Sequence, residues 1–434
     1  MTALERPRAE EPVRRPVRIP FPVVDEVSRH CAQEEEPETV HIEVHLPGQL
    51  ASGRLRTAFT EALRRHPRIL MRETPRHWYS RRYEWELTPG PEAEVVTFPP
   101  PGKDALRDAR ARALSRVPPL TLSPPVRLEV VRGAAPDTGT VLLLTINHTA
   151  LDGPACLRVL ATAAELYGGK DNSPAAPPVR SPEPVRDPPD VPSPWTPPAR
   201  VAPGAPESSP GNGLLVTELP LPHRPKGSPY TVNDQLMAAT ALTVAHWNAE
   251  QGARPRPLRI TMPVDDRPRD ATMPIGNGTR LVDVTFMPEE LNQELSVLLR
   301  RTAHRTRALK SMPRPQLGHG AALLTAPVLP VAWRAAATRA LRRAATPWTS
   351  TTLLSNIGRI PYALDFGEEA GRAHAVWFSA PARMPRGLTV TTASTAGRLH
   401  LALRWSRALL GHGDGAHLRD LFEHYLHSTE EGHQ

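Results

Sequence analysis

The amino-acid sequence predicts an α/β protein built from two lobes, each with a mixed, mostly antiparallel sheet and flanking helices. Three observations favour this fold class. The chain has 434 residues, which is more than one ordinary hydrophobic core accommodates. Strand-like patterns alternate with apolar residues at helical spacing, and the second half of the chain repeats the order of the first. A proline-rich stretch separates the two series of elements.

The composition divides the chain into folded lobes and proline-rich connections. Hydrophobic residues make up 39% of the chain and charged residues 23%, so most of it is expected to be globular. The 52 prolines cluster, and clustered prolines indicate loops and stiff linkers. We expect a loose proline- and arginine-rich N-terminus at 1–20, a first lobe at 21–171, a linker at 172–213 and a second lobe at 214–434.

In the first lobe, the patterns lead up to a strongly apolar strand. We expect a helix at 52–67 and strands at 39–46, 83–87, 126–133 and 140–147. The strand at 140–147 is apolar enough to be a central strand that is buried on both faces. Apolar residues at helical spacing follow it, so residues 148–153 form a turn from a buried strand into a helix.

The second lobe begins with a similar series. A strand at 214–221 is followed by a helix at 231–250 and by two strands before a pair of long arginine-rich helices. The remaining strands are expected at 257–264, 279–286, 349–356, 373–378, 387–394 and 398–405. A final helix closes the chain.

The net charge and the cysteine content limit the partners and the cellular compartment that are expected for this protein. The net charge of +8 permits nucleic acid, a membrane surface or a phosphorylated small molecule as a partner. The arginines are spread along the chain and no basic region interleaved with aromatic residues is recognised, so we expect no nucleic-acid partner. Cys31 and Cys156 form no C-x-x-C motif, which fits a reducing compartment. Without a recognisable signal peptide or spanning segment, a cytoplasmic protein is expected.

The segment Asn147-His148-Thr149-Ala150-Leu151-Asp152-Gly153 is the strongest candidate for chemistry. A histidine at the end of a strand is held by the sheet and projects into a cleft, and imidazole has a suitable pKa for a general base near neutrality. Asp152, at the start of the following helix, is able to accept backbone hydrogen bonds or pair with a cation. Gly153 allows close approach of the backbone.

Several further segments occur in the order found in one superfamily. These are the H-x-x-x-D-G motif after an apolar strand, TVNDQLMAA at 231–239, MPVDDRPRD at 262–270, GNG at 276–278, LLSNIGRIP at 353–361 and the ending GRLHLALRWSRALL. From about Thr39 to the last helix, the chain resembles the superfamily of nonribosomal peptide synthetase condensation domains, chloramphenicol acetyltransferase-like enzymes, and polyketide-associated or wax-ester-type acyltransferases. It lacks a Q-D-Y-P-F-type segment, which moves the resemblance toward the stand-alone acyltransferases.

The resemblance implies roles for individual residues. His148 matches the catalytic histidine, Asp152 the aspartate that organises the loop, and Gly153 the glycine beside the reacting carbonyl group. Arg267 matches an arginine that pairs with that aspartate. Asn147 stands where the family usually has its first histidine, and its amide can keep a structural hydrogen bond but cannot titrate.

The implied fold is two chloramphenicol-acetyltransferase-like lobes with an active-site tunnel between them. The implied activity is transfer of an acyl group from a coenzyme A or carrier-protein thioester to an amine or hydroxyl, in nonribosomal peptide, polyketide or lipid biosynthesis. The donor would be a coenzyme A or phosphopantetheine thioester, and no bound cofactor is expected. Two alternatives remain open: cyclisation or other chemistry on a carrier-bound substrate, and a catalytically silent scaffold domain.

Other polar residues have competing interpretations. Ser355 and Asn356 follow a strand and either contact the substrate or oxyanion or form a turn. Asn233 and Asp234 are expected to cap the helix at 231–250. No metal site is expected. One group is interpreted as a polar strand face and consists of His41, Glu43 and His45. A second group is interpreted as the entry to a helix and consists of His412, Asp414 and His417.

Overall fold

The computed structural model describes residues 16–32, 35–133, 139–175, 196–268, 270, 272–312, 316–317 and 319–431. Most of the expected loose N-terminus, residues 1–15, and the centre of the expected linker, residues 176–195, lie outside these ranges. Arg18–Pro20 lies within them and forms strand β1, which pairs with β4 (Glu84–Leu87). The expectation of a loose chain is therefore wrong for these three residues.

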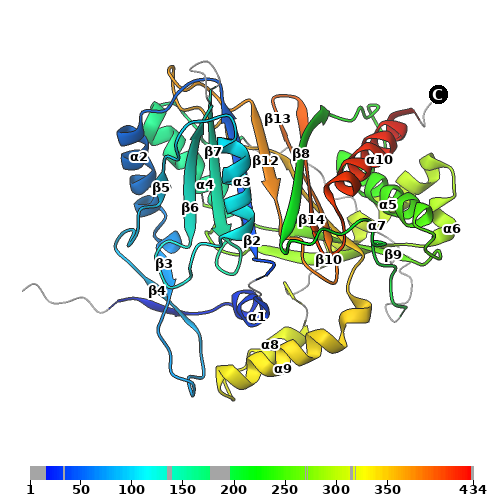
Figure 1. The fold of residues 1–434 in the computed structure, drawn as a ribbon, viewed down its shortest axis with the longest axis horizontal. Coiled ribbons are helices and arrows are strands. Elements are labelled where there is room, and N and C mark those ends of the chain that lie inside the picture. The colour runs from blue at the N-terminus through cyan, green and yellow to red at the C-terminus, as the bar shows by residue number, and fades with distance from the viewer. Residues whose placement is uncertain are drawn as a thin grey trace, which may run out of the picture.

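The first lobe is built on a five-stranded sheet with the order β12-β2-β7-β6-β5. Its strands are Ala375–Ser379, Thr39–Leu46, Thr140–Asn147, Val126–Arg132 and Val96–Thr97, in that order. Strand β7 is central and all of its residues except Val141 are buried, as the sequence predicts. Helices α2 (Ser52–Arg65) and α4 (Gly153–Gly168) pack together on one face of the sheet, and α3 (Ala105–Ser115) contacts β6 and β7 (Figure 1).

The second lobe is built on a six-stranded sheet with the order β10-β9-β11-β13-β14-β8. Its strands are Thr279–Phe286, Leu258–Asp265, Thr352–Arg359, Leu388–Thr395, Arg398–Ser406 and Asn212–Pro220. Strand β11 is parallel to β9 and β13, and the other pairings are antiparallel. The covering helices are α5 (Val232–Glu250), α6 (Pro288–Leu291), α7 (Leu295–Ser311) and α10 (His412–Glu431).

One strand crosses between the lobes. Strand β12 follows β11 in the chain, yet it pairs antiparallel with β2 at the edge of the first-lobe sheet. It also contacts β13 and β14 of the second sheet. The sequence-based division, which assigns residues 214–434 to the second lobe, is wrong for this strand. All five of its residues are buried, so its pattern carries no information about which sheet it joins.

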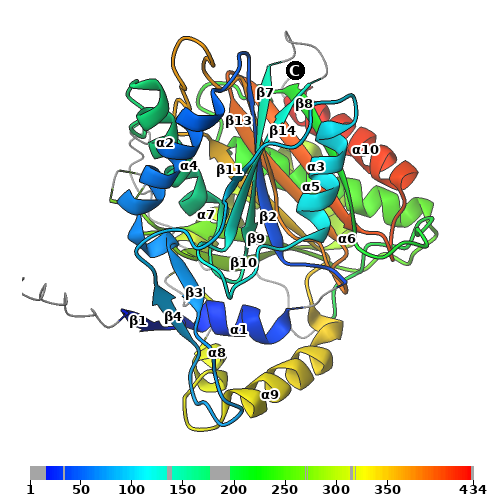
Figure 2. The same ribbon diagram turned by 60° about the vertical axis from the view of Figure 1, so that its left-hand side comes forward.

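A smaller layer lies at one end of the molecule (Figure 2). It contains a three-stranded sheet of β1, β4 and β3 (Met71–Glu73), and helix α1 (Val23–Cys31). Helices α8 (His319–Leu324) and α9 (Val331–Ala344) pack on α1. Two short 3-10 helices complete the described elements, Pro67–Ile69 and Thr346–Trp348.

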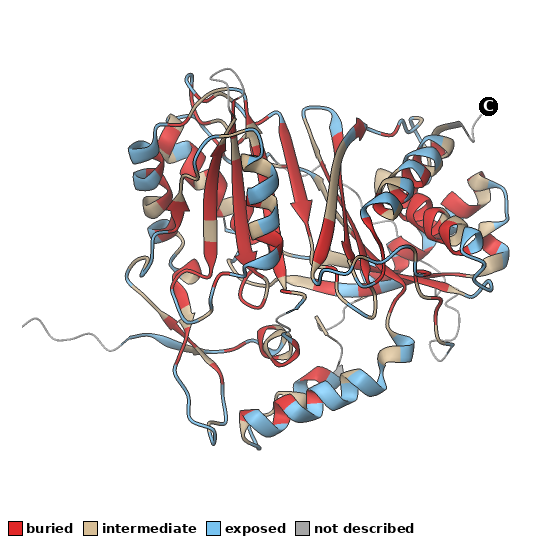
Figure 3. Ribbon diagram, in the orientation of Figure 1, coloured by how far each residue is buried: buried red, intermediate tan, exposed pale blue. Residues whose placement is uncertain are grey.

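Each lobe has its own hydrophobic core (Figure 3). Cys31 and Cys156 are both buried and unbridged, in agreement with the sequence analysis. Among the described helices, none has the length and apolar character needed to cross a bilayer.

The buried His41 on β2 gives a prediction about pH and stability. Burial lowers the pKa of His41 to about 3, and Arg404 acts in the same direction. Above about pH 6.5 the His41 imidazole is neutral in both the folded and the unfolded chain. Just below that pH the unfolded chain binds a proton on this ring, whereas the folded chain does not. His41 should therefore cost about 2 kcal/mol of stability at about pH 5.

The variant His41→Phe tests this, because the described structure shows no hydrogen-bond partner for either ring nitrogen. Urea unfolding between about pH 7 and pH 5 should show that the wild type loses about 2 kcal/mol more than the variant. Parallel pH dependences in the two proteins would mean that His41 titrates normally in the fold.

Candidate active site

The loop between β7 and α4 is fixed at its start by Asn147. The Asn147 Nδ2 donates to the Pro118 carbonyl at 2.9 Å, and its Oδ1 accepts from the Thr149 N–H at 3.1 Å. Both groups of the amide are used and the side chain is buried. Asn147 thus makes the structural hydrogen bonds expected of it.

His148 is held with one ring nitrogen bound and lies half-buried. Its Nδ1 is 3.1 Å from the Leu151 carbonyl oxygen. Because a carbonyl oxygen only accepts, Nδ1 carries the proton and Nε2 of the neutral ring is left as the basic nitrogen. The His148 backbone N–H donates to the Glu38 carbonyl at 2.9 Å, which ties the residue to the chain leading into β2.

Asp152 is buried and accepts three hydrogen bonds. Its Oδ1 accepts from the Ala155 N–H at 3.0 Å and so caps α4. Its Oδ2 accepts from Arg267 Nη2 at 2.8 Å and from the Gly278 N–H at 2.9 Å. Burial raises the pKa of Asp152, and these donors oppose the rise. Since all three partners donate N–H groups, the carboxyl group is held as a carboxylate.

Arg267, from the second lobe, pairs with two carboxylates. Besides Asp152, it donates to Asp265 through Nε at 2.9 Å and Nη2 at 2.8 Å. Burial opposes its charge, but the two carboxylates outweigh this and raise the pKa of Arg267. The pairing implied by the resemblance is therefore present, and Asp265 is a second partner that no sequence motif indicates.

The GNG turn at 276–278 is a second contact between the lobes at this loop. Asn277 Nδ2 lies 3.2 Å from the His148 carbonyl oxygen, 3.1 Å from that of Thr149 and 2.9 Å from Asp25 Oδ1. The Gly278 N–H reaches Asp152, so the turn holds both ends of the loop. The GNG segment is family-like in sequence, but no residue pattern indicates a function for Asn277.

Asp25 supports this turn from α1. It accepts from Asn277 and, through Oδ2, from Trp85 Nε1 at 2.9 Å. Burial raises the pKa of Asp25 to about 6, with the two donors opposing the rise. No residue pattern around Asp25 indicates this function, because its partners lie 60 and 252 positions away.

Two substitutions test the turn. Asn277→Ala should lower the free energy of unfolding by about 1 to 3 kcal/mol, since buried acceptors lose their donor. Asn277→Asp should be more harmful above about pH 6 than below it, because an ionised carboxylate would then face Asp25 and two carbonyl oxygens without a proton to donate. Urea unfolding at two pH values measures both effects. If Asn277→Asp showed no pH dependence relative to the wild type, the inferred packing around Asp25 would be wrong.

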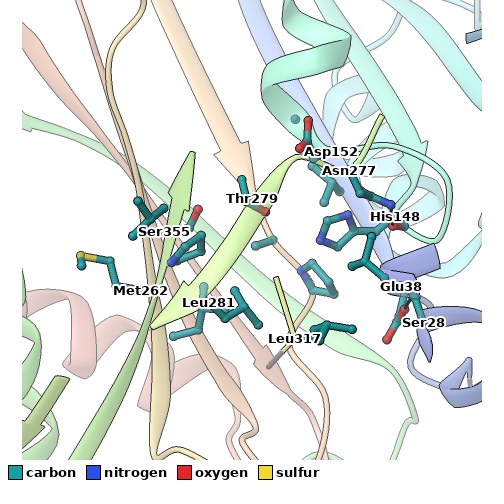
Figure 4. Close-up of a pocket in the computed structure, with 18 of the residues that line it drawn as sticks. Ser28, Glu38, His148, Asp152, Met262, Asn277, Thr279, Leu281, Leu317 and Ser355 are labelled. Atoms are coloured by element: carbon teal, nitrogen blue, oxygen red, sulfur yellow. Dashed lines mark hydrogen bonds between the residues drawn. The ribbon is translucent and has the colours of Figure 1, made fainter. Parts of the chain in front are cut away.

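A cavity of about 920 Å³ lies between the lobes, where the resemblance places the active site. His148, Asp152 and Asn277 lie together on one side of it, with Ser355 and Met262 on the opposite side (Figure 4). Most of the lining is apolar, and helices α8 and α9 close part of it with Ala321, Leu324 and Leu341. Such a cavity suits a substrate with a large apolar portion.

Gly153 lies at a tightly packed position in the cavity wall. A Cβ atom at this position would lie 3.0 Å from two ring carbons of Phe378 on β12. Phe378 therefore packs directly against the start of α4. This crowding is a structural reason for glycine, and a contact of Gly153 with a reacting carbonyl group stays a prediction.

Ser355, Asn356 and Asn233 line the cavity. Asn356 is engaged locally: its Nδ2 donates to Asn233 Oδ1 at 3.2 Å, and its Oδ1 accepts from the Gly358 N–H at 2.9 Å. Asp234 forms the expected capping box with Thr231. Asn233 does not cap the helix, so that expectation is wrong for Asn233 and correct for Asp234. Substrate or oxyanion contact by Ser355 and Asn356 stays a prediction.

The other polar groups make structural contacts. Glu43 binds Arg110 through two hydrogen bonds of 2.6 and 2.8 Å and lies 2.6 Å from His45. Asp414 accepts from the Ala205 and Gly411 N–H groups, and His417 contacts Glu250. Within the described residues, no group of three histidines, cysteines or acids is placed to hold a metal ion.

Comparison with solved structures defines the class to which this fold belongs. The chain has the two-lobed α/β fold of solved condensation domains and of an acetyltransferase. The condensation domain of the monacolin K polyketide synthase MokA matches with a TM-score of 0.62 and 12% identity over 96% of this chain and 98% of its own. The first condensation domain of the CDA synthetase matches with a TM-score of 0.63 and 14% identity, over 95% of this chain and 96% of its own.

An acetyltransferase also has this fold. The TRI3 trichothecene 15-O-acetyltransferase from Fusarium sporotrichioides matches with a TM-score of 0.63 and 13% identity over 96% of both chains. By sequence, an uncharacterized protein of Mycobacterium tuberculosis is 28% identical over 380 residues, which are 80% of this chain and 84% of the relative. No family model matches the chain.

Proposed function

We propose that this chain is an acyltransferase that moves an acyl group from a thioester to an amine or hydroxyl, with His148 as the general base. His148 Nε2 removes the acceptor proton while the acceptor nitrogen or oxygen bonds to the acyl carbon. The tetrahedral centre then collapses and the carbon–sulfur bond breaks. The imidazolium returns its proton to the leaving thiolate, so the free enzyme is restored.

One observation carries this proposal. The Leu151 carbonyl fixes the proton of His148 on Nδ1, and the ring lines the large cavity between the lobes. A neutral imidazole with its basic nitrogen free, at a cavity wall formed by both lobes, is the arrangement that general-base catalysis needs. Asp152, Arg267 and Asn277 support it by fixing the loop that carries His148.

The donor class is coenzyme A or a phosphopantetheine arm on a carrier protein. The condensation domains and the acetyltransferase that share the fold motivate this choice. We place the reaction in natural-product biosynthesis, of nonribosomal peptides, polyketides or lipids, and in the cytoplasm, where the two buried thiols would stay reduced. The acyl thioester is a substrate, and the proposed chemistry needs no resident metal or cofactor.

The test is a matrix of acyl thioesters, on coenzyme A and on carrier proteins, against pooled amines and alcohols. Free thiol is followed with time, and products are identified by mass. Thiol release that requires an acceptor, together with a product heavier by the acyl group, is expected. Release without any gain of an acyl group would indicate cyclisation, and binding of a carrier protein without chemistry would indicate a scaffold. Either result would overturn acyl transfer.

A further inference from the structure

The loop between β3 and β4 lies beside α8 and α9 at one end of the molecule (Figures 1 and 2), and these segments carry large exposed apolar side chains. Their exposed fractions are far above those of core residues, from 52% for Leu329 to 81% for Leu323. We call this surface the aromatic face, and it consists of Trp78, Tyr79, Leu323, Val328, Leu329 and Trp333. Clustered exposure of this kind marks an interaction surface.

The two segments that form the aromatic face are tied to each other. The Val331 N–H, at the start of α9, donates to the Ser80 carbonyl at 2.8 Å. Arg334 Nη2 donates to the Arg81 carbonyl at 2.6 Å, and its Nη1 lies 2.9 Å from Glu26 Oε1 on α1. Arg334 is buried, so these contacts hold the loop and α9 in one arrangement. The segments that carry the exposed side chains are therefore held next to each other.

The aromatic face is surrounded by positive charge. Arg81 and Arg82 follow Trp78 and Tyr79 in the loop, and Arg343 is exposed on α9. Arg76 precedes them and pairs with Glu73 at 3.4 Å. Neither 74–83 nor 295–364 contains an aspartate or a glutamate. The loop thus interleaves basic and aromatic residues, which corrects the expectation from sequence that no such region exists.

We propose that the aromatic face binds the surface of a lipid bilayer that contains anionic lipids. Tryptophan and tyrosine favour the boundary between headgroups and acyl chains, where the ring is in an apolar layer and the polar edge is hydrated. Each arginine near an anionic surface adds to the attraction. Exposed aromatic residues beside the exposed Arg81 and Arg82 match both properties of that surface.

The shape of this end favours a bilayer over a folded protein. The loop and the two helices project from the body of the molecule, and the outer surface of α9 is largely exposed (Figure 3). Side chains that project from a convex end are able to enter a headgroup layer, whereas a protein interface needs a complementary surface around them. Without a described spanning helix, such binding would be peripheral.

The same helices also reach the cavity. The cavity is lined by Ala321 and Leu324 of α8 and by Leu341 of α9. The same two helices carry the exposed side chains of Leu323 and Trp333. Bilayer docking would therefore bring one wall of the cavity to the lipid surface. This inference does not depend on the proposed acyl transfer, because binding is measured without donor or acceptor.

The experiment is sedimentation of the full chain with vesicles. One set contains phosphatidylcholine alone, and the other contains equal parts of phosphatidylcholine and phosphatidylglycerol. The wild type should bind the anionic set at low ionic strength, and added salt should weaken the binding. Trp78→Ser/Trp333→Ser should lower the partition coefficient at least about tenfold, since two interfacial side chains are lost.

A charge pair provides a matched control. Arg81→Gln/Arg82→Gln should lower binding to anionic vesicles by about tenfold. Arg254→Gln/Arg256→Gln removes the same charge from an exposed turn between α5 and β9, outside the aromatic face, and should change binding less than about twofold. Because these arginines are exposed, this comparison stays informative if the tryptophan variant fails to fold.

Three results would overturn the proposal. The first is no binding of the wild type to anionic vesicles at low ionic strength. The second is an equal loss of binding in the two arginine variants, which would indicate attraction through net charge alone. The third is self-association of the wild type that depends on concentration and disappears in Trp78→Ser/Trp333→Ser, with no binding to vesicles. This result would indicate that the aromatic face binds a second copy of the chain.

Discussion

Replacing His148 by alanine is expected to lower turnover by at least about a hundredfold while the protein stays folded. The imidazole makes one hydrogen bond, from Nδ1 to the Leu151 carbonyl, and is half-buried, so its loss removes little packing. What disappears is the nitrogen that removes the acceptor proton. Thiol release with a saturating acceptor measures the effect, and circular dichroism with urea unfolding checks the fold.

His148→Asn separates the two functions of the ring. An asparagine amide can still donate to the Leu151 carbonyl, but it has no basic nitrogen, so this variant should be as inactive as the alanine variant. His412→Ala serves as a control, because His412 is exposed at the start of α10. A fully active His148→Asn protein would show that the residue acts only through its contact with the loop.

Arg267→Met is expected to have the largest effect on stability, a loss of about 3 to 5 kcal/mol. The guanidinium group is 9% exposed and lies between Asp152 and Asp265, which are 4% and 13% exposed in their side chains. Methionine keeps much of the volume but leaves two largely buried carboxylates without their cation. Urea unfolding at neutral pH measures the loss.

The matched control is Arg398→Met. Arg398 pairs with Glu218 at 2.7 Å, but both side chains are more than a third exposed, at 45% and 40%. Solvent screens that pair, so its loss should cost at most about 1 kcal/mol. Equal losses of stability in the two variants would contradict the view that Arg267 neutralises a buried cluster.

The Arg267 variant should also lose activity, by an indirect route. Asp152 accepts from Arg267, Gly278 and Ala155, and the loop that carries His148 ends at this carboxylate. Without Arg267, the buried Asp152 carboxylate is stabilised by moving toward solvent or by taking up a proton. Either change would displace the loop. Activity should therefore be recovered partly at lower temperature, whereas His148→Ala should stay inactive.

The sequence alone determined the parts of the site that are local in the chain. Thr140–Asn147 is apolar along its whole length and forms the central strand, and residues 148–153 make the turn into α4 as expected. Strand and helix periodicity fix which residues point inward, and a capping aspartate follows from its position at a helix start. The family-like segments also indicated the fold that the structural comparison shows, and they placed Arg267 against Asp152.

The tertiary structure alone decided which distant segments complete the site. It joins β12 to the first-lobe sheet, and it brings Asn277 and Asp25 to the carbonyl groups of the His148 loop. It also gives two neighbouring residues different contacts: Asn233 lines the cavity, whereas Asp234 caps α5. A periodic pattern reports that a residue is buried, but not against which partner. These contacts join positions more than 100 residues apart, and only the packing of both lobes selects among the possible partners.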